Sequence, residues 1–141
     1  MKYVKIKNNT PKIIASLQGQ PLAQAVMAGA FVIEGAVKVS MSADAKTGRV
    51  YGRHQASSPG EPPGVDTGVL VNSIRSRLLS SGSTSAFAVV GTGVEYGVYL
   101  EFGTSKMKAR PFMRPAFDNN QDRIKQAIQY WAKKRISGAA T

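Results

Sequence analysis

The sequence predicts an α+β fold made of two substantial helices and an antiparallel hairpin. Apolar side chains recur at helical spacing over residues 22–37 and again over residues 117–131, which predicts the helices. Two β-prone runs, residues 75–80 and 85–92, flank a turn-forming Ser-Gly-Ser-Thr and predict the hairpin. With 141 residues, 43% of them apolar, the chain is long enough to bury a core, and we expect a single domain over residues 1–141.

The N-terminal region predicts a strand followed by two helices. Lys5 and Lys7 alternate with apolar neighbours, as in a short half-buried strand. Thr10 and Pro11 form a helix-start signal, and Gly19 ends the brief helix expected over residues 11–18. Pro21 opens the long helix. Its expected core stripe spans about 80° and consists of Leu22, Val26, Ala30, Ile33 and Val37.

The opposite side of the long helix carries two large apolar side chains, Met27 and Phe31. They lie one turn apart and can cover the same patch. Either a second subunit or a neighbouring segment of the same chain could bury them.

The middle of the chain predicts a long loop and several short elements. Residues 44–66 are rich in Pro and Gly, and we expect a loop that is mobile or becomes ordered on a partner. Asp66 or Thr67 is expected to cap a helical turn carrying Val69, Leu70 and Ile74. Residues 96–102 predict another short helix, which ends at Gly103.

The C-terminal helix is expected to begin at Pro115. Phe117, Ile124, Ile128 and Trp131 follow helical spacing and form its apolar stripe. Residues 137–141 are expected to fray.

The composition argues against enzymatic chemistry. The chain has no cysteine, one histidine and eight carboxylates, so cysteine nucleophiles and histidine-rich metal sites are excluded. No catalytic motif is present, and we expect no catalytic residue, no cofactor and no metal. A hydrolase using Asp66 or Glu101 is the weakest of the functions considered. Polar residues interrupt the charge-poor region around residues 13–36, so we expect no membrane segment.

The net charge of +11 points to anionic partners. Basic residues gather in three places: near the N-terminus, over residues 106–114 and over residues 125–135. Such a surplus attracts polyanions, but no base-reading motif accompanies it. A small basic module that binds nucleic acid non-specifically is therefore one hypothesis for the function.

Three ordered blocks resemble the small tail-completion or neck proteins of long-tailed bacteriophages, which join the head to the tail. The blocks are VDTGVLVNSI at residues 65–74, VEYGVYLEFGTSKM at 94–107 and ARPFMRPA at 109–116. The resemblance implies an α+β subunit with a long helix packed on a small antiparallel sheet. It also implies a virion protein, assembled in the host cytoplasm, that forms a ring between the head connector and the tail terminator or tube proteins. DNA would pass through its lumen without sequence-specific contact.

We expect a subunit interface formed by aromatic residues of this family-like region together with the patch on the long helix. Tyr96, Tyr99, Phe102 and Phe112 offer large contact areas at low entropic cost, although most of the four could instead fill the core. The candidate interface therefore comprises Met27, Phe31, Tyr96, Tyr99 and Phe102.

Two further predictions concern the basic residues after Phe102. A ring of about twelve copies would carry about 12 × 11 positive charges, against about 24 phosphates over about 40 Å of duplex, so at most one basic cluster lines the channel. The candidate lining is Lys106, Lys108 and Arg110. We also expect Glu101 to accept a bidentate bond from the Arg110 guanidinium, an ion pair that would fix the loop 103–109.

Overall fold

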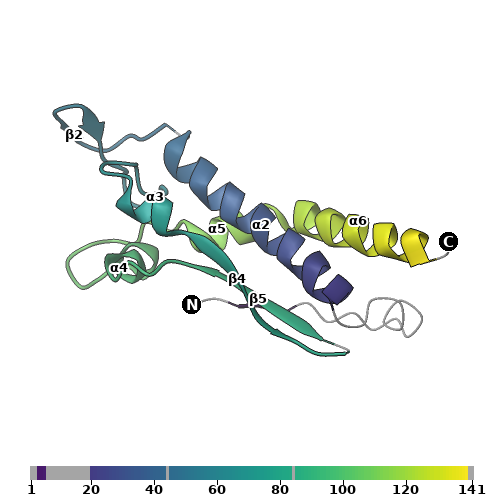
Figure 1. Cartoon of the computed structure of the whole chain (residues 1–141). Coiled ribbons are helices and arrows are strands. Elements are labelled where there is room, and N and C mark those ends of the chain that lie inside the picture. The colour runs from purple at the N-terminus through teal and green to yellow at the C-terminus, as the bar shows by residue number, and fades with distance from the viewer. Residues whose placement is uncertain (1–2, 6–19, 44, 84, 140–141) are drawn as a thin grey trace. The chain divides into compact units, whose positions relative to one another are not determined.

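The computed structural model describes residues 3–5, 20–43, 45–83 and 85–139, and it has the expected α+β composition (Figure 1). The described chain divides into two compact units built from interleaved segments, and the single domain stays a prediction. The first unit comprises residues 1–33, 76–90 and 120–141, and the second comprises residues 34–75 and 91–119. The brief helix expected over residues 11–18 and Lys7 of the first strand lie outside the described residues.

The first unit contains a three-stranded antiparallel sheet. Strand β1 (Tyr3–Lys5) pairs with β5 (Ala86–Gly91), which also borders β4 (Arg75–Ser81), giving the order β1-β5-β4. The register places Tyr3 opposite Val89. As the central strand, β5 is mostly buried, whereas β4 is largely exposed. The predicted hairpin is confirmed.

Helix α2 (Gln20–Ser42) is the predicted long helix. Its core stripe is buried as expected at Val26, Ala30, Ile33 and Val37. Gly29 allows α6 to approach closely, because a Cβ built on it would lie 3.0 Å from Ile128 Cδ1. By length and composition, residues 22–42 could also cross a membrane. The buried face on this helix is what a core helix of a folded protein requires.

The C-terminal region forms two helices instead of the single one expected from Pro115. Helix α5 (Met113–Asp118) ends where Asn119 N–H donates to Pro115 O, and α6 (Gln121–Ala139) begins after a two-residue turn. The two consecutive asparagines explain the break, since asparagine favours turns and caps over helix interiors. Phe117 therefore does not share a helix with Ile124. Helix α6 extends to Ala139, and the fraying expected over residues 137–141 stays a prediction.

The second unit contains a small hairpin within the region that the sequence predicts to be a mobile or partner-ordered loop. Strands β2 (Val50–Tyr51) and β3 (His54–Gln55) form a small hairpin. The following turn is held by the Glu61 carboxylate, which accepts hydrogen bonds from Ser58 N–H at 2.8 Å and from Thr47 N–H at 3.1 Å. The Thr47 hydroxyl, together with these two backbone bonds, holds the pKa of the Glu61 carboxyl below its ordinary value. The mobility of this region, or its ordering by a partner, stays a prediction.

Short helices complete the second unit. Helix α3 (Val69–Ser73) carries the buried Leu70 and is followed by the fully buried Ile74. Its N-cap is Gly68 at φ 81°, and neither Asp66 nor Thr67 caps it, because the chain enters in a left-handed conformation that favours glycine. Helix α4 (Tyr96–Phe102) has the predicted bounds and ends at Gly103, whose φ is 76°.

Candidate assembly surface

Helix α4 leaves an apolar stripe uncovered in the second unit. Val98, Tyr99 and Phe102 are 56%, 48% and 65% exposed. At about 100° per residue these three side chains share one side of the helix with Glu95. We refer to Val98, Tyr99 and Phe102 as the α4 stripe.

The sides of α4 away from this stripe face the protein. Gly97 is buried so tightly that a Cβ built there would lie 2.7 Å from Thr92 Cγ2. Glu101 lies next to Gly97 on the helical wheel. Its Oε2 accepts hydrogen bonds from the Phe112 and Met113 N–H groups at 2.8 and 2.9 Å, and its Oε1 accepts one from the Arg114 N–H at 3.0 Å. These amides open α5 and have no partner within that helix. Glu101 thus joins α4 to the start of α5.

The predicted ion pair between Glu101 and Arg110 is wrong. Both oxygens of Glu101 are engaged by backbone amides, and no salt bridge joins the two residues in the described part of the chain. The start of α5 offers several aligned N–H donors that lack partners within the helix, which makes it a strong competitor for the Glu101 carboxylate. Instead, the Nη1 group of Arg110 lies 3.8 Å from Met107 Sδ.

The loop after α4 is closed by backbone bonds. Gly103 N–H donates to Tyr99 O at 2.8 Å, Thr104 N–H to Met107 O at 2.8 Å, and Arg110 N–H to Leu100 O at 2.6 Å. The loop presents Lys106 and Lys108 to solvent. Of the three residues predicted to line a DNA channel, these two are exposed together, whereas the Arg110 side chain is half-buried.

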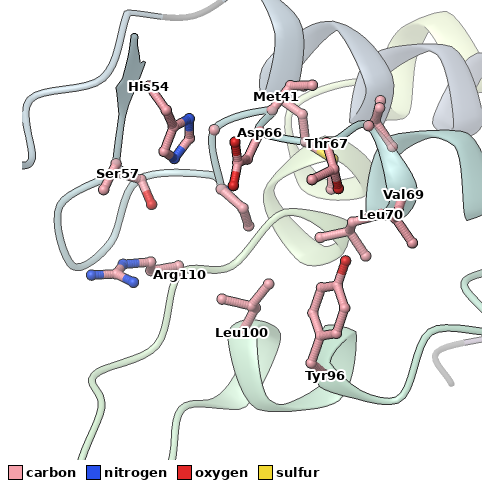
Figure 2. A pocket seen from close by; sticks show the side chains of 16 residues that line it. Met41, His54, Ser57, Asp66, Thr67, Val69, Leu70, Tyr96, Leu100 and Arg110 are labelled. Carbon is pink, nitrogen blue, oxygen red and sulfur yellow. The ribbon is translucent and has the colours of Figure 1, made fainter. Parts of the chain in front are cut away.

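A cavity of about 300 Å³ lies beside α4 in the second unit. Figure 2 shows Tyr96 and Leu100 pointing from α4 toward Leu70, with Asp66 and His54 on the opposite wall and Arg110 at the edge. The Nε atom of Arg110 is buried without a hydrogen-bond partner. We call this space the second-unit cavity. No local sequence pattern predicts this cavity, because its lining comes from separate segments between Met41 and Arg110.

The other predicted interface residues lie in the first unit. Met27 is half-buried and Phe31 is 58% exposed. Both line an apolar groove of about 510 Å³ together with Ala127 and Trp131 of α6. The alternative of a neighbouring segment is met in part, because α6 flanks the patch. Phe31 stays open to solvent, and its burial by a second subunit stays a prediction.

The aromatic side chains of the family-like region divide unevenly between core and surface. Only Phe112, at 1% exposure, fills the core, whereas Tyr96 is 45% exposed and the two aromatics of the α4 stripe are open. The expectation that most of the four would be buried is wrong, because α4 directs its aromatic side chains away from Gly97. Among the described residues, no group of three or more His, Cys, Asp or Glu side chains could hold a metal ion.

Comparison with known proteins identifies a family. Residues 19–103, more than half of the chain, match the HK97-gp10-like family, described as "Bacteriophage HK97-gp10, putative tail-component". No curated protein and no solved structure gives a significant match. The match includes α2 and α4, the whole first block at residues 65–74 and residues 94–103 of the second block that resembles phage tail-completion proteins. The chain therefore belongs to the HK97-gp10-like family of bacteriophage tail components.

Proposed function

We propose that this protein is a structural subunit of the phage neck, where it forms a ring that joins the head connector to the tail and completes the tail. Family membership gives the tail-component character. The observation that supports a ring is the α4 stripe, in which Phe102 is 65% exposed. Contiguous exposed apolar patches of this kind mark protein–protein contact sites, and aromatic side chains dominate such contacts.

The partners in this proposal are copies of the chain itself, the head connector and the tail terminator or tube proteins. Assembly takes place in the host cytoplasm and the product resides in the virion. The protein works by contact alone, with no catalysis.

DNA passes through the ring, and Lys106 and Lys108 remain the candidate lining. Both side chains are exposed, and neither has a hydrogen bond or ion pair within the described residues. Lysine suits this role because it presents a hydrated point charge without the fixed geometry of a guanidinium. Arg110 is removed from this set, since its side chain lines the second-unit cavity.

The proposal is tested by infecting cells with phage in which this gene carries a stop codon. We expect DNA-filled heads and separate tails in the lysate, with few joined particles by electron microscopy. Purified wild-type protein added to the lysate should restore joining, and the exposed-site control Tyr51→Ser should restore it equally well. Normal yields of joined particles without the protein, or its absence from purified virions, would overturn the proposal.

The same purified protein separates this function from non-specific nucleic-acid binding. A free DNA-binding module that contacts several phosphates should lose about a thousandfold in affinity between about 50 and 200 mM salt. A neck subunit should show little affinity for duplex DNA before it assembles. Tight, strongly salt-dependent binding by the unassembled protein would favour the nucleic-acid hypothesis.

A further inference from the structure

We propose that neighbouring copies contact one another head to tail, with the α4 stripe of one copy docking on the second-unit cavity of the next. This inference rests on the proposed ring and specifies the surfaces that build it. Both surfaces belong to the second unit, and helix α4 contributes to both of them.

The two surfaces lie on opposite sides of one helix. Tyr96 and Leu100 line the cavity, whereas Val98 and Phe102 are open to solvent. At about 100° per residue, Phe102 projects about 160° away from Leu100. A contact between two different and oppositely directed surfaces leaves one of each free, so it repeats from copy to copy. Heterologous contacts of this kind generate rings when the rotation between copies closes.

The apolar parts of the two surfaces suit each other. The cavity of about 300 Å³ is walled by Leu70 and Leu100, and its rim carries Val69 at 53% exposure. On the docking side, Phe102 offers a large ring that has only two side-chain torsions to immobilise. A Phe102 ring entering the cavity would bury apolar surface on both copies.

Charge also favours a second copy as the occupant. Arg110 lies at the cavity edge, and its Nε atom is buried without an acceptor. Glu95 stands beside the α4 stripe, and its side chain makes no capping bond. A buried donor without an acceptor is costly, and a carboxylate satisfies a guanidinium well. We therefore pair Glu95 of one copy with Arg110 of the next. In this arrangement Glu95 meets the edge of the cavity that carries Arg110 and not the wall that carries Asp66.

Cysteine cross-linking in assembled particles tests the contact, because the natural chain has no cysteine. Phage are grown with the double variant Val69→Cys/Val98→Cys, and purified virions are treated with a short bis-maleimide. We expect a ladder of multimers that ends in one closed species, while each single variant stays monomeric. In the matched control Val39→Cys/Val98→Cys, the replaced Val39 is 59% exposed and also lies in the second unit, and this control should give no ladder.

Each outcome has a defined meaning. If the protein is present in virions but the Val69–Val98 pair gives no ladder, the head-to-tail contact is wrong while the proposed function stands. Dimers from Val98→Cys alone would show a two-fold contact and would also overturn the inference. Absence of the wild-type protein from virions would overturn the proposed function itself.

Charge reversal gives a second measurement. Glu95→Arg and Arg110→Glu should each lower the yield of infectious particles by about tenfold or more, since each leaves two like charges facing one another. The double variant should recover most of the yield. No recovery in the double variant, with both single variants folded by circular dichroism, would argue against this pairing.

Discussion

Replacing Glu101 tests how strongly one carboxylate joins α4 to α5. In Glu101→Ala, three backbone N–H groups at 2.8, 2.9 and 3.0 Å lose their acceptor. The Arg114 amide is exposed and can bond to water, whereas the Phe112 and Met113 amides are half-buried. Loss of an N-cap acceptor costs about 0.5–2 kcal/mol, and a buried donor left without an acceptor costs about 1–3 kcal/mol. We therefore expect the free energy of unfolding to fall by about 2–4 kcal/mol.

Urea denaturation followed by circular dichroism measures this loss, with the slope against denaturant compared between variants. Glu101→Gln keeps one oxygen acceptor but loses the charge, and it should lose about 1–2 kcal/mol because charge-assisted bonds are roughly twice as strong as neutral ones. The matched control is Glu95→Ala, which removes a carboxylate from the same helix that makes no capping bond, and it should change stability by less than about 0.5 kcal/mol. Equal losses in Glu101→Ala and Glu95→Ala would refute the capping argument.

Three further predictions follow from the described contacts. Because the pKa of Glu61 is lowered in the folded chain, its contribution to stability is present above the ordinary carboxyl pKa of about 4.3 and is lost as the pH falls through the folded value. The protection factors of the amides in its loop, taken relative to the intrinsic exchange rate at each pH, should fall on acidification, and Glu61→Gln should remove this step. Gly35→Ala, with open space around its Cβ, should stabilise the protein by about 0.5–1 kcal/mol. Gly29→Val should destabilise it by about 1–3 kcal/mol, because the Cβ position of Gly29 lies 3.0 Å from the α6 side chain Ile128. A destabilised Gly35→Ala or a stabilised Gly29→Val in urea melts would contradict this packing. Phe102→Ser should leave the urea midpoint of the isolated protein nearly unchanged, since the side chain is 65% exposed. It should nevertheless fail to restore the joining of phage heads to tails when the purified variant is added to the lysate. Full restoration of joining would show that the α4 stripe is not part of the assembly surface.

Elements with local signals could be predicted from the amino-acid sequence alone. The 3.6-residue period gave the buried face of α2, and the two β-prone runs around a turn gave the β4–β5 hairpin. Gly103 correctly marked the end of α4, because a residue at positive φ stops a helix without reference to the rest of the chain. The three family-like blocks also indicated the phage tail family that the comparison confirmed.

Which polar groups bond to one another could not be predicted, because it depends on the folded chain. Glu101 and Arg110 are near in sequence and opposite in charge, yet the carboxylate bonds the amides that open α5 and the guanidinium lies at the edge of the second-unit cavity. Hydrogen-bond partners are chosen by the competition among all donors within reach, and that set exists only once the chain has folded. The same reason explains the bond that the Glu61 carboxylate accepts from the backbone N–H of Thr47, fourteen residues away, in a region whose composition predicts only a loop.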